Sequence, residues 1–196
     1  MVKPFGGSIY CGIESTFAVN HKKQSVRLTV RPPNIDEVPL IVNYFHHASE
    51  ADLIQMGAAA ELLPTPEEWT KKLELQLKLP DREKELFYLL WCVNEKPIGH
   101  SNLSHLQYGK TAKVHLHLWS REQRKGGFGK QFMERCLEHY FTRFKLKEII
   151  CEPKAENPAP NKLIPQLGFN LLKTYTTTPG PINTKQLVHR YQLKKE

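Results

Sequence analysis

Cysteines are few in this sequence, and long apolar segments are missing. Cys11, Cys92, Cys136 and Cys151 lie far apart and form no C-x-x-C pair, which excludes a zinc module and a dense disulfide framework. No apolar run approaches the roughly 18 residues that span a bilayer, so a membrane protein is not expected. Residues 1–15 also lack the contiguous apolar stretch of a secretory signal. These absences predict a protein of the reducing cytoplasm.

Acidic residues are outnumbered by basic ones. The chain has 20 Asp and Glu against 28 Lys and Arg, which gives a formal net charge of +8 and a pI near 9.3. Such a charge invites an anionic partner and says nothing about the fold. Aromatic residues do not interleave with the basic residues in the pattern of a nucleic-acid platform, so we read most of this excess as a solvated surface.

The 196 residues fit one domain, with residues 1–24 as an arm and 25–196 as the domain proper. Apolar alternation and turn residues predict strands at 25–33, 86–93, 98–106, 112–119, 147–153, 169–175 and 185–193. Helical spacing and capping residues predict helices at 34–49, 64–79 and 128–144, and a shorter one between 157 and 168. We therefore expect an α/β (α+β) domain whose mixed, mostly antiparallel sheet of about seven strands is flanked by helices.

A glycine-rich loop opens the helix predicted at 128–144. The segment Arg124-Lys125-Gly126-Gly127-Phe128-Gly129 follows a predicted strand directly. Such a loop presents free backbone N–H groups at the positive end of the helix dipole, and its glycines let a phosphate approach closely. A tight turn without a ligand would also use glycines. The flanking basic residues favour a site for a di-anion.

This R-x-x-G-x-G segment resembles the coenzyme A pyrophosphate loop of the GNAT superfamily of N-acetyltransferases. Asn157, followed by an apolar helix and then by Gly168-Phe169, resembles a second signature of that family. The predicted order of elements is similar from residue 25 to residue 193. The resemblance implies a GNAT-like domain that transfers acetyl groups from acetyl-CoA to amines, loosely like the ribosomal-protein branch of the family.

The resemblance also implies which residues hold the cofactor. Backbone N–H groups of the glycine loop would bind the pyrophosphate, the end of the fourth strand would lie along the pantetheine arm, and Asn157 would hydrogen-bond that arm. The residues implied to bind acetyl-CoA are Leu118, Trp119, Arg124, Lys125, Gly126, Gly127, Phe128, Gly129, Lys130, Asn157, Asn161 and Lys162.

Two positions depart from the family pattern. Ile164 stands where the family has the tyrosine that protonates the departing thiolate, and Pro160 stands where some ribosomal-protein acetyltransferases have a serine. Pro165 is expected to bend the short helix. Water or a residue such as Tyr175 would then supply the proton.

Acetyl transfer requires a base for the amine, and the sequence offers three candidates. Glu152 at the end of the fifth strand is the first, and His115 and His117, on one face of the fourth strand, are the second. Each also has a plain alternative, an exposed carboxylate or a polar sheet face. Zinc binding by the H-x-H pair would need further ligands from His100, His105 or Cys151, and we expect no metal.

The sequence therefore predicts an acetyl-CoA dependent N-acetyltransferase that acts on an amine of a small molecule or protein. A coenzyme A binding module without turnover and a basic nucleic-acid-associated protein are the alternatives. We expect no membrane partner, do not expect nucleic acid, and consider a homodimer possible. The acceptor amine is not identified by the sequence.

Overall fold

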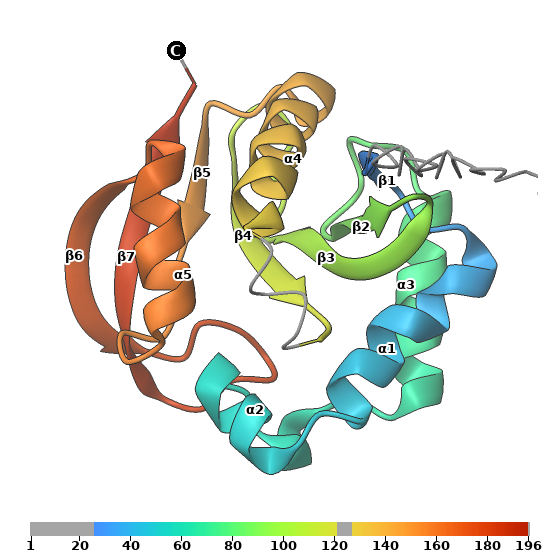
Figure 1. Ribbon diagram of the computed structural model, residues 1–196, viewed down its shortest axis with the longest axis horizontal. Helices are drawn as coiled ribbons and strands as arrows, with labels where there is room; N and C mark the ends of the chain where they lie inside the picture. Colours follow the sequence, from blue (N-terminus) through green and yellow to red (C-terminus); the bar gives the residue numbers. More distant parts are fainter. Residues whose placement is uncertain (1–25, 121–126, 196) are drawn as a thin grey trace, which may run out of the picture.

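One twisted sheet organises the chain in the computed structural model, which describes residues 26–120 and 127–195 (Figure 1). In the described residues the sheet has seven strands in the order β1-β2-β3-β4-β5-β7-β6. Every pairing is antiparallel except that of β4 with β5. The strands are β1 (Leu28–Arg31), β2 (Phe87–Val93), β3 (Lys96–Ser104), β4 (Thr111–Leu118), β5 (Glu148–Cys151), β6 (Asn170–Thr177) and β7 (Gln186–Lys194). The predicted fold class is confirmed, while the predicted arm at 1–24 lies outside the described residues.

The strands β2, β3 and β4 form the predicted meander. Asn94 and Glu95 connect β2 to β3 with φ values of 48° and 65°, and two such left-handed residues match the right-handed twist of a tight hairpin. Strand β2 is buried over nearly its whole length because helices cover both faces of the sheet. This explains its continuous apolar sequence.

Helices cover the two faces in separate groups. One face carries α1 (Val38–His46) and α3 (Pro66–Lys78), whose apolar side chains pack on Tyr88 and Leu90 of β2. The other carries α4 (Phe128–Phe144), with α5 (Pro158–Leu163) and the 3-10 turn η4 (Ile164–Leu167) beside it. Each group buries its own apolar core against the sheet.

The segment between β1 and α3 differs from the prediction of a single helix at 34–49. Asn34 caps a 3-10 turn, η1 (Ile35–Glu37), through a capping box with Glu37, and α1 begins only afterwards with Pro39 in its first turn. A further helix, α2 (Glu50–Met56), was not predicted, although Ser49 caps its start and Gly57 ends it in a left-handed conformation. The short 3-10 turn η2 (Ala60–Leu62) leads on to α3.

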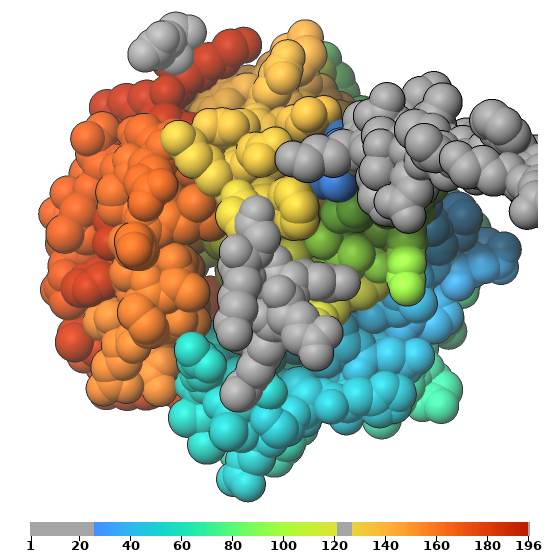
Figure 2. Space-filling view, viewed as in Figure 1, coloured from blue at the N-terminus to red at the C-terminus, as the bar shows by residue number. Residues whose placement is uncertain are grey.

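Helix α2 is joined to the loop between β6 and β7. Asn183 Nδ2 and Gln186 Nε2 both donate to the carbonyl oxygen of Gly57, at 2.9 and 3.1 Å, and the Ala59 amide donates to Ile182. Gly57 has a φ of 76°, a left-handed conformation that favours glycine, and a Cβ there would also displace the end of the Gln186 side chain. In the space-filling view the surface of α2 meets that of α5 (Figure 2). We call the contact of Gly57 with Asn183 and Gln186 the α2 clasp.

No helix in the described parts of the chain is both long and apolar enough to cross a membrane.

Candidate functional site

The middle of the sheet opens where β4 and β5 part. The two strands are paired only over Thr111–Lys113 of β4. Beyond this point β4 continues to Leu118 alongside β3, whereas β5 ends at Cys151. The fourth and fifth strands therefore part after Lys113. Backbone groups that face such a gap can bind a ligand, because the sheet does not use them.

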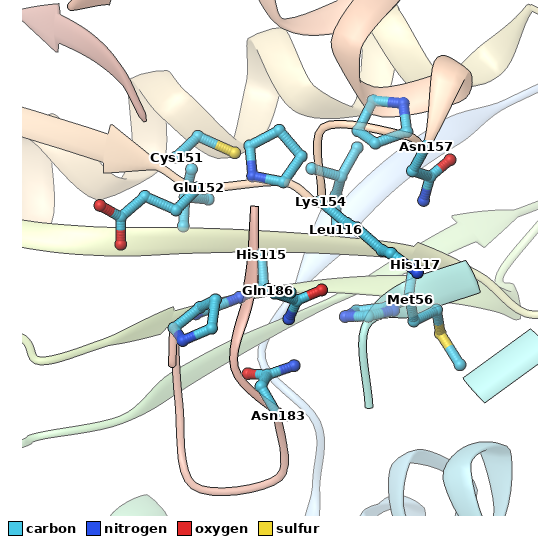
Figure 3. Close-up of a pocket in the computed structure, with 14 residues that line it drawn as sticks. Met56, His115, Leu116, His117, Cys151, Glu152, Lys154, Asn157, Asn183 and Gln186 are labelled. Carbon is cyan, nitrogen blue, oxygen red and sulfur yellow. The ribbon is translucent and has the colours of Figure 1, made fainter. Parts of the chain in front are cut away.

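A pocket of about 100 Å³ lies in this gap (Figure 3). Glu152 and His115 lie toward one end of it, and His117, Met56 and Asn157 lie toward the other. The three catalytic candidates therefore share one pocket. Its described lining residues are Met56, Val114, His115, Leu116, His117, Cys151, Glu152, Pro153, Lys154, Asn157, Pro160, Pro179, Asn183 and Gln186.

The carboxylate of Glu152 is held by three side chains. The Glu152 side chain is only 2% exposed, and Lys113 Nζ lies 2.7 Å from its Oε2. Arg190 and the Tyr175 hydroxyl donate to Oε1 at 2.7 and 2.6 Å. Burial raises the pKa of this carboxyl, but the bonds from Lys113, Tyr175 and Arg190 outweigh it and leave the pKa below its ordinary value. Glu152 is thus a stable anion with both oxygens occupied.

The same arrangement determines the protonation state of Tyr175. Its hydrogen bond to the Glu152 carboxylate raises the pKa of the phenol, which keeps the hydroxyl protonated. The ring lies on β6, and it is not among the residues that line the pocket. Its proposed role as the donor to the thiolate stays a prediction.

His115 lies at the Glu152 end of the pocket. Its Nε2 is 2.8 Å from the Ser104 hydroxyl, and the Ser101 hydroxyl donates to its carbonyl oxygen at 2.8 Å. Desolvation, together with the charge of nearby Lys113, lowers the pKa of His115 to about 4. The imidazole is therefore neutral at pH 7, with Nε2 engaged and Nδ1 as the nitrogen through which it can meet a ligand.

His117 lies in an aromatic setting. Its ring stacks on His100 with centroids 4.8 Å apart, and Tyr44 and Phe45 lie at 5.5 and 5.1 Å. Trp119 Nε1 donates to Nδ1 of His100 at 2.8 Å. Burial lowers the pKa of His100 well below its ordinary value, so this second ring is neutral. Across the described ranges, no three His, Cys, Asp or Glu side chains are grouped to hold a metal ion.

The helix end predicted to bind phosphate is described from Gly127 onward. Gly127 has a φ of 69° and caps α4 without a side-chain hydrogen bond, and the first turn holds no acidic residue. A Cβ at Gly129 would make only an ordinary contact, 3.6 Å from Leu163. The helix dipole at this end favours an anion, and the N-cap glycine has no side chain to occupy the first N–H groups. The predicted ligands Arg124, Lys125 and Gly126 lie outside the described residues.

The neighbouring residues of this helix end have ordinary surroundings. Phe128 is partly buried against the α4 core, and Lys130 pairs with Glu134 at 3.7 Å on the helix surface. Lys130 can still add positive charge near a bound phosphate, because the pair is exposed to solvent.

Asn157 and Asn161, both predicted to contact the cofactor, use their Nδ2 atoms differently, although the buried Oδ1 of each has no partner among the described residues. Asn161 Nδ2 lies 2.7–3.2 Å from three carbonyl oxygens of the turn that leads into α5, so its amide stabilises that turn. Asn157 Nδ2 donates to Gln55 of α2, but its buried Oδ1 has no partner among the described residues. An orphaned acceptor that faces a pocket fits a ligand with a donor, such as the amide of a pantetheine arm. Lys162 is exposed on α5.

Leu118 and Trp119, the two predicted cofactor residues at the end of β4, lie on opposite faces of the sheet. Leu118 packs against the α4 core and Trp119 against the α1 and α3 core. Neither belongs to the described pocket lining. Ile164, at the position of the family tyrosine, is fully buried. The α-helix ends before it, and the 3-10 turn η4, which contains Pro165, follows where we expected a bend.

Sequence reasoning missed the residues that surround the candidates. Lys113 and Arg190 contact the Glu152 carboxylate, and Ser104 contacts His115. Asn102, on the same strand as Ser104, is buried. Lys113 could have been found, because it shares a strand face with His115. Arg190 could not have been found in this way, because its contact with Glu152 depends on the pairing of β5 with β7.

Comparisons with known proteins agree with this geometry. The family model described as an acetyltransferase (GNAT) domain matches residues 27–170. No curated protein sequence is similar enough to count as a match.

Solved structures resemble the fold at low sequence identity. A spermidine N-acetyltransferase from Vibrio cholerae, in complex with CoA and spermine, has a TM-score of 0.69 at 18% identity, over 85% of this chain and 95% of that one. A ribosomal L7/L12 α-N-protein acetyltransferase in complex with coenzyme A has a TM-score of 0.68 at 17% identity, over 87% and 95%. A dodecameric structure of the Vibrio cholerae enzyme has a TM-score of 0.66 at 18% identity, over 85% and 93%.

Proposed function

The chain belongs to the GNAT family of acetyltransferases, enzymes that use acetyl-CoA as co-substrate, and from this premise we propose that it acetylates a primary amine bound between β4 and β5. The observation that carries the proposal is the pocket itself. It places a neutral histidine, a buried carboxylate and an orphaned amide oxygen where two central strands part. Direct transfer needs the amine and the thioester side by side, and this gap is the place where both could meet.

The residues present fit coenzyme A. The glycine-capped N-terminus of α4 would supply N–H groups for the pyrophosphate, and Oδ1 of Asn157, without a partner among the described residues, would supply an acceptor for a pantetheine amide. Acetyl-CoA supplies an activated acetyl group as a thioester when bound. The protein's own tasks are to orient the amine and to remove its proton.

For that proton we propose His115 ahead of Glu152. The Glu152 carboxylate already accepts from two cations and a phenol, which leaves neither oxygen free to take the amine proton. His115 is neutral and lines the pocket, and because its Nε2 is engaged by Ser104, Nδ1 is the nitrogen that we assign to the amine. His117 is the second candidate, and Glu152 then has an electrostatic role that orders Lys113, Arg190 and Tyr175.

The charge of the pocket favours an acceptor with one amine and no further positive charge. Glu152 is the only acidic residue in the described lining, and Lys113 and Arg190 already neutralise it. Lys154 adds a cation to the wall. A polyamine, the ligand of the Vibrio cholerae enzyme, would bring further cations to these. The α-amine of a peptide or of an amino-acid-like molecule suits the wall better, in line with a protein N-terminus as acceptor.

Calorimetric titration with acetyl-CoA and a thiol-release assay over a panel of amines test the proposal. The panel contains peptides with free N-termini, small monoamines and spermidine. We expect acetyl-CoA to bind and thiol to be released with peptides or monoamines faster than with spermidine. Binding without thiol release from any amine would favour the coenzyme A binding module, and faster turnover of spermidine would overturn the assignment of the acceptor class.

A further inference from the structure

Three polar side chains connect the pocket to the surface. His115 lines the pocket, and its Nε2 lies 2.8 Å from the Ser104 hydroxyl. That hydroxyl lies 3.2 Å from Nδ1 of His105, whose side chain is exposed to solvent. Each group can both donate and accept, so the three can be hydrogen-bonded in a single direction, from the pocket outward.

The local backbone explains why the three side chains meet. Asn102 pairs with His115, and Ser104 with Lys113, in the antiparallel β3–β4 register, so Ser104 and His115 are diagonal neighbours on one face. A regular strand would send the next side chain to the opposite face. Strand β3 ends at Ser104, and His105 adopts a φ of 50°, which turns its imidazole back to the Ser104 hydroxyl. A left-handed conformation is uncommon for a residue other than glycine.

We propose that Ser104 and His105 form a proton relay that carries the proton of the acceptor amine from His115 to solvent. The inference rests on the proposed function. Nδ1 of His115 takes the amine proton while its Nε2–H passes to the Ser104 oxygen, and the Ser104 proton passes to Nδ1 of His105. The exposed His105 then gives a proton from Nε2 to water. As the thiolate leaves, water in the pocket carries the Nδ1 proton of His115 to it, and the relay refills from the surface. One proton thus leaves the amine for solvent, one reaches the thiolate, and His115 returns to its starting tautomer.

The charges around His115 favour passing a proton on over keeping it on the imidazole. Lys113 on β4 and His105 at the end of β3 face it, and Glu152 after β5 faces it from the opposite strand. Desolvation and the two basic neighbours outweigh Glu152 and hold the pKa of His115 near 4. An imidazolium at this position is therefore disfavoured, and a proton that enters the ring has to leave through its other nitrogen.

Ser104 and His105 do not touch the amine, so they act through His115, and a structural role has to be separated from a relay. We would compare Ser104→Ala with Ser104→Thr, which keeps a hydroxyl, and add His105→Asn, because asparagine tolerates the left-handed backbone. The readouts are kcat and KM for the best amine, the Kd for acetyl-CoA, and the dependence of kcat on the concentration of an imidazole buffer.

At low buffer concentration we expect Ser104→Ala and His105→Asn to lower kcat about tenfold with unchanged acetyl-CoA affinity, and Ser104→Thr to retain most of it. In His105→Asn, rising imidazole concentration should restore kcat, because a diffusing base replaces the lost surface group. Wild-type kcat in both Ser104→Ala and His105→Asn, or a loss that no buffer restores, would overturn the relay while leaving the transferase intact. A wild-type protein that acetylates no amine would overturn the proposed function and the relay together.

Discussion

Two regions around the pocket are built from different groups. The helix-end region, Gly127–Lys130 with Asn157, offers backbone N–H groups and a neutral amide. The charged region consists of His115, Glu152, Lys113 and Arg190, all titratable or charged. Backbone groups do not titrate, so the first region can bind by shape and dipole at any pH, whereas the second can control protons. Variants of the first should change affinity, and variants of the second should change turnover and pH dependence.

The largest effect is expected at Gly129. Gly129→Glu should abolish acetyl-CoA binding, with a loss of at least about 100-fold in affinity, because the carboxylate would occupy and repel the phosphate position. The fold should survive, since a Cβ there meets only Leu163 at an ordinary distance. Titration calorimetry and circular dichroism check both points. Gly129→Ala is the matched control, and equal affinity in Gly129→Glu and wild type would show that the loop is a plain turn.

His115 is expected to give the next largest effect. His115→Ala should lower kcat roughly 100-fold, in the range usual for loss of a general base, without changing the Kd for acetyl-CoA. His117→Ala is the matched comparison on the same strand face, and we expect a smaller loss. Thiol release under saturating substrates measures both. A larger loss in His117→Ala would reverse the assignment, and full activity in both would mean that positioning alone carries the catalysis.

Glu152→Gln should affect stability more than it affects turnover. The change keeps the size of the side chain but leaves Lys113 and Arg190 without their counter-charge, so unfolding free energy should fall by roughly 1–3 kcal/mol. We expect kcat to fall by about tenfold, less than in His115→Ala. Urea unfolding and the thiol assay provide the two measurements.

Glu156→Gln is the control for that variant. Glu156 also pairs with a lysine, Lys154, but its side chain is 80% exposed, so its removal should leave stability within about 0.5 kcal/mol of wild type. A loss of turnover in Glu152→Gln as large as 1,000-fold would return Glu152 to the role of base.

The smallest effect concerns stability at mildly acidic pH. His100 and His115 have lowered pKa values in the folded chain, the latter about 4, so the unfolded chain binds more protons than the folded one between pH 6.5 and pH 4. Stability should therefore fall as the pH falls through this window, by roughly 1–2 kcal/mol from pH 7.5 to pH 6. The lowered pKa of Glu152 adds a second loss below about pH 4.3, the ordinary value for glutamate.

Urea unfolding of wild type and His115→Gln across this range tests the histidine contribution. The variant should show a shallower dependence on pH, because one of the lowered histidine pKa values has been removed. Identical unfolding free energies at pH 7.5 and pH 5 in the wild type would contradict the linkage.

The sequence predicted the elements whose signals are local. Alternation located all seven strands to within a few residues, and the Thr65 cap and Pro66 located α3. Helix α2 was missed even though Ser49 and Gly57 mark its ends. It is only seven residues long with one buried side chain, Leu53, so its apolar period is too short to stand out.

The site was predictable in its candidates but not in their partners. Glu152, His115 and His117 could be named from strand ends and strand faces. The state of each depends on residues brought in by tertiary pairing, such as Arg190 for Glu152 and Ser104 for His115. A pKa is set by these neighbours and by burial, neither of which one strand can specify. The predicted order of the candidates therefore rested on residue type and strand position alone.

The α2 clasp has a consequence for folding during synthesis. Its two hydrogen bonds join Gly57 to Asn183 and to Gln186, which follow it in the sequence by 126 and 129 positions. During synthesis Gly57 leaves the ribosome long before Asn183 and Gln186 are added. The wall of the pocket that contains these two residues can therefore form only when the end of the chain emerges. Until then the face of α2 that meets this loop is uncovered, and a nascent chain cut short before Asn183 would carry every candidate catalytic residue yet lack the wall that closes around them.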